Sequence, residues 1–237
     1  PAFKMKFWNI GAEGQILVGG CMTAGLMLAL GGTVPTPVLL VIMAIASLCA
    51  GAVWGMIPAV FKARWGTNET LFTLMMNYVA IQITSYCVAL WENPYGSNVV
   101  GVINQSTKDG WFPALFGQAY GLNVLIVAVL TVGMYIYLKS SKQGYEIAVV
   151  GESQNTARYA GIRLSKVFIR TMAISGAICG LAGFIAVAGA SHTISTSTAG
   201  GRGFTAIIVA WLAQFNTFVM VLISFLLVFL QKGAIQI

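Results

Sequence analysis

The chain has 237 residues, of which 58% are hydrophobic and only 8% are charged, and its formal net charge is +7. Soluble domains carry about 25% charged residues, so this chain has too few to cover a soluble globule. The composition therefore excludes an ordinary cytosolic enzyme, a disordered protein and a secreted disulfide scaffold. It predicts an integral membrane protein, in which residues 1–237 form a single transmembrane domain.

Six apolar runs divide the chain, and most of them approach the ~20 residues that a membrane-spanning helix needs. They cover residues 15–32, 38–60, 70–91, 121–138, 171–190 and 217–230. Backbone amides in hydrocarbon must bond within their own element, so we expect an all-α polytopic helix bundle. Pro1 is not a start methionine and the last run stops near the end of the chain, so we expect a piece of a longer protein.

The basic residues predict how the helices cross the membrane, because cytoplasmic loops collect Lys and Arg. Lys62 and Arg64 follow the second run, and six more basic residues lie within residues 139–170. Both loops should be cytoplasmic, with residues 33–37 and 92–120 outside. Only Lys108 and Arg202 then fall on the outer side. This asymmetry explains the positive charge without a nucleic-acid partner.

No motif in the sequence predicts catalysis or a metal site. The chain has one His and one Asp, and it lacks GxxxxGK[ST], HExxH, GxSxG and CxxC patterns. All four cysteines lie in apolar runs, where we expect buried, unpaired side chains. We expect no cofactor and no metal.

Two glycine-rich polar segments interrupt the apolar pattern, at residues 9–15 (NIGAEGQ) and 199–204 (AGGRGF). Each precedes a stretch of small apolar residues. They are either related discontinuous helices that meet at a central pathway, as in transporters built from repeats, or ordinary interfacial loops. Glu13 and Arg202 occupy corresponding places with opposite charge. They either pair, line the path or lie exposed at the interface.

Two further polar features stand out. Asn77 and Gln82 interrupt the third run, where buried amides most often join neighbouring helices. In the long cytoplasmic loop, residues 151–161 are typical of a short helix that Ser153 caps and Gly161 ends. Such a helix either lies on the membrane surface or inserts into a groove of a partner.

Four segments together resemble bacterial ABC-transporter permeases of the branched-chain amino acid, ribose and nucleoside type, and the nucleoside subgroup in particular. They are NIGAEGQ at residues 9–15, KARWGTNETLFTLMMNY at 62–78, the stretch from Gly144 to Ile162, and GFTAIIVA at 203–210. Their order and spacing hold over nearly the whole chain. Departures from the family pattern are Ala148 in place of Arg, Arg202 in place of an uncharged residue, and Ala206 and Ala213 in place of glycines.

The resemblance implies a multi-pass permease subunit of the bacterial plasma (inner) membrane, with discontinuous helices and a cytoplasmic coupling helix. Its partners would be an ABC ATPase, a second permease subunit and a solute-binding lipoprotein or periplasmic protein. The solute would be a nucleoside or a sugar. Residues expected to line the substrate path are Asn9, Glu13, Gln15, Asn77, Arg202 and Phe204. Within the loop at 139–170, residues expected to contact the ATPase are Gly151, Glu152, Ala157, Arg158, Tyr159, Ala160 and Gly161.

Two other functions are compatible with the composition. An ion-coupled secondary transporter or channel would need an ion or proton site within the spans, and only Glu13, Glu69 and Arg202 near the span ends are available. A membrane-embedded scaffold subunit would need no path, which leaves the polar breaks at residues 11–15 and 200–204 unexplained.

Overall fold

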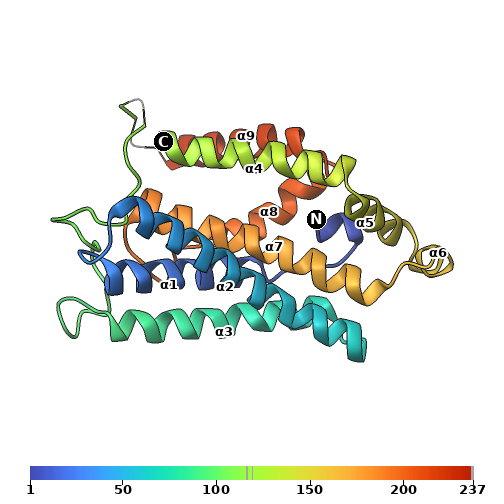
Figure 1. The fold of residues 1–237 in the computed structure, drawn as a ribbon, viewed down its shortest axis with the longest axis horizontal. Coiled ribbons are helices and arrows are strands. Elements are labelled where there is room, and N and C mark those ends of the chain that lie inside the picture. Colours follow the sequence, from blue (N-terminus) through green and yellow to red (C-terminus); the bar gives the residue numbers. More distant parts are fainter. Residues whose placement is uncertain (116, 119, 236–237) are drawn as a thin grey trace.

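A computed structural model describes residues 1–115, 117–118 and 120–235, and the described part of the chain is helical without a β-sheet. Six of its helices are long and apolar enough to cross a membrane, one for each predicted run. In chain order (Figure 1) the elements are η1 (Phe3–Met5), α1 (Ala12–Leu30), α2 (Thr36–Trp65), α3 (Glu69–Leu90), α4 (Gly121–Ser140), α5 (Lys142–Glu152), α6 (Gln154–Tyr159), α7 (Leu164–Ala186), the π-helical turn η2 (Val187–Ser191), α8 (Arg202–Leu212) and α9 (Thr217–Ile235).

Local sequence signals fix the turn between α2 and α3. Gly66 adopts a left-handed φ of 66° and ends α2, a conformation that costs glycine little. Two residues later the Asn68 side chain accepts hydrogen bonds from the backbone N–H groups of Thr70 (3.0 Å) and Leu71 (3.3 Å). This cap satisfies donors that the first turn of α3 would otherwise leave unpaired.

The centre of the molecule is formed by α1, α2 and α7, which approach each other backbone to backbone. Glycines make this approach possible. A methyl group added at Gly51 would collide with the Gly176 carbonyl, and one added at Gly19 would collide with Gly180. Small residues at such crossings are the usual means of packing helices in a membrane, where no hydrophobic force drives them together.

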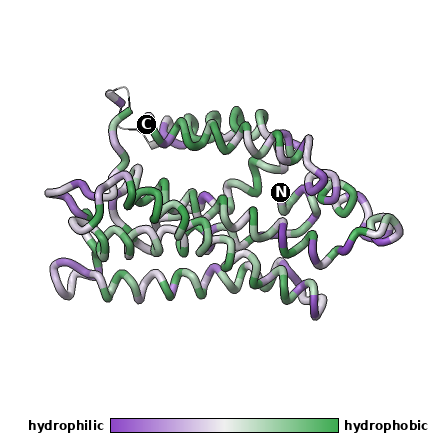
Figure 2. The backbone as a smooth tube through the Cα atoms, viewed as in Figure 1, coloured by the Kyte–Doolittle hydropathy of each residue, from purple (hydrophilic) through white to green (hydrophobic). Residues whose placement is uncertain are grey.

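The helices α4 and α9 form a separate pair beside this centre (Figure 1), joined in part by the rings of Tyr135 and Phe218, whose centroids are 4.8 Å apart. No described residue of either helix is buried. Figure 2 shows both helices as almost continuously hydrophobic. On α4, Ile126 and Leu130 pack against the core of the chain. Most other apolar side chains of the pair are exposed, so they face lipid or another chain.

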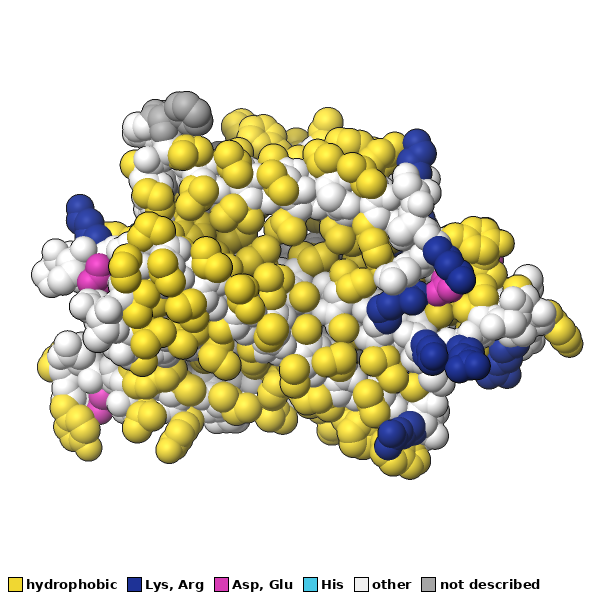
Figure 3. All heavy atoms as spheres, in the orientation of Figure 1, with side chains coloured by type: hydrophobic (Ala, Val, Ile, Leu, Met, Phe, Trp, Pro, Cys, Tyr) yellow, Lys and Arg dark blue, Asp and Glu magenta, His cyan; other side chains and the backbone are white. Residues whose placement is uncertain are grey.

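Basic side chains gather at the end of the molecule that carries α5 and α6 (Figure 3). Two ion pairs lie there, Lys62 with Glu69 at 2.7 Å and Arg170 with Glu146 at 2.5 Å. The predicted charge asymmetry is thus a property of the folded chain, and we refer to this end as the inner end.

The long connection between α3 and α4 covers the opposite, outer end and reaches η2. The Ile103 N–H donates to the His192 carbonyl (2.8 Å), and the indole N–H of Trp111 donates to the Ile103 carbonyl (2.9 Å). The Trp111 and His192 rings stack with centroids 3.8 Å apart. His192 is therefore held at the end of the α7–η2 helix.

Cysteine burial agrees fully with the prediction only at Cys21. Cys21 is buried, and Cys87 and Cys179 are half-buried, but Cys49 is exposed on α2. In a bilayer an exposed thiol that faces lipid costs little, because free Cys behaves as a small hydrophobe.

Candidate functional site

The two glycine-rich segments meet in space. Glu13, in the first turn of α1, points its carboxylate at the start of α8 and accepts hydrogen bonds from the backbone N–H groups of Gly201 (2.7 Å) and Gly203 (2.8 Å). The carboxylate thus neutralises the positive end of the α8 dipole through two charge-assisted bonds. Only glycine fits at position 203, because an added methyl group would overlap the Glu13 backbone.

The first turn of α1 is also tied to α3. The Gly14 N–H donates to the Asn77 side-chain oxygen (2.8 Å), and the Asn77 amide donates to the Ile10 carbonyl (2.9 Å). The Ile10 N–H donates to the Thr73 hydroxyl (3.2 Å). The Asn77 and Thr73 side chains are buried, and a buried polar group without a hydrogen-bond partner would destabilise the fold. These bonds supply the partners. Asn77 therefore joins helices, as the sequence favoured.

Asn9 and Gln15 complete the same network. The Asn9 side-chain oxygen accepts from the Gly11 N–H (3.0 Å), and the two amide side chains contact each other at 3.3 and 3.4 Å. Both are buried. We call Asn9, Glu13, Gln15, Thr73 and Asn77 the polar brace, because they hold together the beginnings of α1 and α8 and the inner part of α3.

Arg202 and Phe204, the other two predicted path residues, are exposed in the first turn of α8. Within the described residues no ion pair joins Arg202 to Glu13, so the pairing considered for these residues is not formed. The reason is geometric: the Glu13 carboxylate is already occupied by backbone N–H groups on either side of Arg202.

The depth of Arg202 also differs from the prediction, which placed it on the outer side. The helix α8 has 11 residues, so it is about 16 Å long, roughly half of the ~30 Å hydrocarbon core. It ends at the linker 213–216, which lies beside Lys4 and Lys139 at the inner end. The start of α8 is therefore near the middle of the membrane, and α8 is a half-helix.

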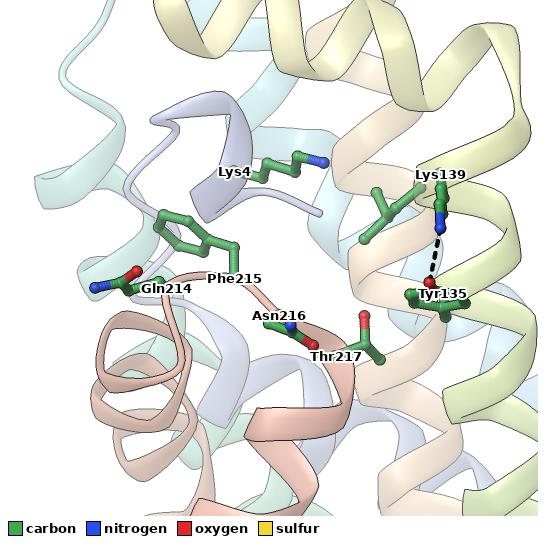
Figure 4. A pocket seen from close by; sticks show the side chains of 8 residues that line it. Lys4, Tyr135, Lys139, Gln214, Phe215, Asn216 and Thr217 are labelled. Carbon is green, nitrogen blue, oxygen red and sulfur yellow. Dashed lines mark hydrogen bonds between the residues drawn. The ribbon is translucent and has the colours of Figure 1, made fainter.

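A cavity of about 310 Å³ lies where α8 gives way to α9 (Figure 4). Gln214 and Phe215 adopt left-handed φ angles there, of 48° and 61°. Lys139 at the end of α4 donates to the Tyr135 hydroxyl at 3.0 Å. The break between the two helices is thus polar and lies at the inner membrane boundary.

The segment between α4 and α7 contains two helices where one was predicted. Ser153 caps α6 by accepting from the Thr156 N–H (3.3 Å), and Gly161 follows it with a φ of 75°, as predicted. Gly151 and Glu152, however, belong to the end of the preceding helix α5. Gly151 has no room for a side chain because α5 crosses the Lys4 backbone closely there.

The predicted ATPase-contact residues on α6 do not all face outward. Tyr159 is 93% exposed, whereas Ala157 is fully buried and packs in the inner hydrophobic cluster with residues of η1, α2, α5 and α7. Arg158, Ala160 and Gly161 are exposed. α6 therefore has one face fixed to this chain and one face free.

Thr73 was missed in the sequence, although it lies four residues before Asn77 and hence on the same face of a helix. The serine- and threonine-rich stretch 195–198 was also missed, because nothing in its composition distinguishes it from a surface loop. Among the described residues no group of three His, Cys, Asp or Glu side chains could hold a metal ion.

Comparison with known proteins identifies the family. The sequence profile of a family described as "Branched-chain amino acid transport system / permease component" matches residues 2–237. The chain is 31% identical to the guanosine ABC transporter permease protein NupP of Bacillus subtilis over 239 residues, which cover 99% of this chain and 68% of the relative. No solved structure matches the chain.

Two further relatives carry names of the same kind. The glucose ABC transporter permease protein TsgB13 of Haloferax volcanii is 31% identical over 89% of this chain and 58% of its own length. The nucleoside ABC transporter permease protein NupB of Lactococcus lactis is 26% identical, over 98% of this chain and 66% of its own length. The chain thus spans roughly two thirds or less of these relatives. It is a multi-pass membrane protein and belongs to the branched-chain amino acid transport system permease family.

Proposed function

We propose that the chain is the permease subunit of an ATP-driven importer for a small polar solute, a nucleoside or a sugar, in a bacterial plasma membrane. Relatives named for guanosine, nucleoside and glucose transport support this solute class. The observation that carries the proposal is the half-helix α8, whose start the Glu13 carboxylate binds near the middle of the membrane. Transporters place their substrate sites at such breaks.

Within this proposal the six candidate path residues have two different tasks. Asn9, Glu13, Gln15 and Asn77 are buried and bonded within the chain, so they hold the broken helices in place. Arg202 and Phe204 are exposed at the start of α8 and face the path. The path is completed by a second permease subunit, which covers the exposed faces of the bundle.

The free face of α6 is the proposed contact with a separate ABC ATPase, on which ATP is hydrolysed. Tyr159 is nearly fully exposed at the inner end, and the opposite face of α6 is anchored through Ala157. Because one face of α6 is packed against the bundle, a displacement of α6 by the ATPase is transmitted to the membrane-spanning helices. A solute-binding lipoprotein or periplasmic protein delivers the solute at the outer end.

Uptake measurements test the proposal. A strain lacking the gene is complemented with the full-length chain, and uptake of radiolabelled nucleosides and glucose is followed with and without an intact ATPase partner. We expect uptake of at least one solute that is lost when the ATPase cannot hydrolyse ATP. Uptake that persists without ATP hydrolysis but collapses with the proton or sodium gradient would instead establish an ion-coupled transporter.

A further inference from the structure

Arg202 is a charged residue placed where a membrane protein rarely has one. The first turn of α8 is about 16 Å from the inner boundary by helix length. A second estimate of the depth comes from α3. The start of α8 is hydrogen-bonded to Glu13, and the adjacent residue Gly14 is hydrogen-bonded to Asn77 of α3, so Asn77 lies at a similar depth. Asn77 is eight residues after Glu69, the first residue of α3, and so about 12 Å along that helix.

The segment that leads to Arg202 from the outer end is not helical. A methyl group added at Gly20 would press on the Ile194 side chain, and Ala199 packs against Ile16 and Leu17. The segment therefore runs along the half of α1 that begins at Ala12, inside the membrane. Thr196, Ser197 and Gly200 in this stretch are exposed. Irregular backbone at this depth is stable only where protein buries it or where it lines a water-filled cavity.

The Arg202 side chain is exposed as well, and in the described part of the chain it makes no ion pair. A guanidinium that faces lipid at mid-depth is strongly unfavourable, and such residues in membrane proteins face an interior or a water-filled cavity instead. Two independent features, the exposed hydroxyl-bearing loop at Thr196 and Ser197 and the exposed Arg202 that follows it, are therefore stable in the membrane only if water reaches this side of the molecule.

We infer that Arg202 is the specificity-determining residue of the path, and this inference rests on the proposed transport function. Its guanidinium lies at the floor of an aqueous vestibule lined by Thr196, Ser197 and Gly200. It presents a planar fork of N–H donors and no acceptor. The vestibule therefore admits neutral solutes rich in hydrogen-bond acceptors and anionic solutes, and it repels cationic ones.

Charged thiol reagents test the vestibule without knowledge of the solute. Ser197→Cys is made in the full-length chain with its native cysteines replaced by serine or alanine, and is assembled with its partners in membranes. The rates of modification by a negatively charged and a positively charged methanethiosulfonate reagent are compared. The comparison is repeated after Arg202→Gln, Arg202→Lys and Lys108→Gln, the last of which removes a positive charge from the outer loop.

We expect the thiol introduced by Ser197→Cys to react from the aqueous phase and to prefer the anionic reagent. Arg202→Gln should lower the anionic-to-cationic rate ratio about ten-fold, as expected for one charge acting across a few ångströms of partly hydrated protein. Arg202→Lys should retain the ratio, and Lys108→Gln should change it less than about two-fold, because water and salt screen the charge of an exposed side chain on the outer loop. An unreactive thiol, or a ratio that Arg202→Gln leaves unchanged, overturns the inference.

Transport of matched solutes provides the second arm. Uridine, its 5′-carboxylate and its 5′-amino derivative differ in charge and share the rest of the molecule. Arg202→Gln should reduce uptake of the carboxylate relative to the amine by about ten-fold. An equal loss for all three would mean that Arg202 pairs with another chain, which contradicts the inference. If the unsubstituted transporter moves no solute while the thiol ratio depends on Arg202, the transport function fails and the charged vestibule stands.

Discussion

The central helices α1, α2 and α7 and the outer pair α4 and α9 are all apolar enough to cross a membrane, but they pack in opposite ways. At the centre, glycines allow backbone to lie against backbone, and the polar side chains of the brace are paired. In the outer pair no described residue is buried. Hydropathy therefore does not distinguish a helix that packs in the centre of the chain from one whose side chains face lipid or a partner. Small residues and hydrogen-bonded polar side chains do distinguish them.

The largest effect should come from filling the central contact. Gly176→Leu forces α7 away from the Gly51 backbone, and we expect it to lower the free energy of unfolding by at least about 3 kcal/mol, the upper range for overpacking. Gly133→Leu is the matched change on α4, where an added methyl group meets nothing within 4 Å, and should stay within about 0.5 kcal/mol. Thermal unfolding of the purified protein measures both. Equal effects would remove the contrast between the regions.

The next effect concerns the polar brace. In the wild-type chain both oxygens of the Glu13 carboxylate accept backbone N–H groups. In Glu13→Gln the amide oxygen can accept only one of them, and the amide NH₂ group faces the other N–H donor. We expect a loss of about 2 kcal/mol in stability and faster hydrogen exchange in the first turn of α8. Arg202→Gln leaves both backbone bonds intact and should keep that exchange rate. Protection lost in both variants would show that the guanidinium, too, holds α8.

A smaller effect should follow from loss of one neutral bond. Thr73→Val removes the hydroxyl that accepts from the Ile10 N–H and should cost about 1 kcal/mol. Thr131→Val on α4 removes a hydroxyl that bonds only to its own helix, at the Val127 carbonyl, and should have little effect. Unfolding in mixed detergent compares the two. A larger cost on α4 than on α3 would contradict the assignment of the brace.

The smallest effect on stability, with a large effect on function, is expected on the free face of α6. Tyr159→Ser should leave unfolding within about 0.5 kcal/mol while uptake and solute-stimulated ATP hydrolysis fall together. Ala157→Trp is unsuitable as a docking test, because it should disrupt the inner cluster. Tyr145→Ser, an exposed change on α5, serves as control. Unimpaired ATP-driven uptake in Tyr159→Ser would exclude α6 as the contact.

Much of the architecture followed from local signals. The six spans, the Ser153 cap and the gathering of basic side chains at one end follow from runs and single residues whose physical effect does not depend on distant parts of the chain. The separate helix α5 was missed, because its short amphipathic pattern merges with the polar loop around it. Ala157 was misplaced for a related reason: on a six-residue helix, composition does not tell which face is anchored.

By itself the sequence determined that this protein lives in a bilayer, how many times its described chain crosses and which end carries the charge, since these depend on the transfer of apolar runs and on loop composition. Only the tertiary structure decided that the Glu13 carboxylate binds the backbone at the start of α8, and that it forms no ion pair with the Arg202 side chain. Both depend on where two segments 188 residues apart meet in space, and that meeting is fixed by close glycine packing that no local pattern encodes.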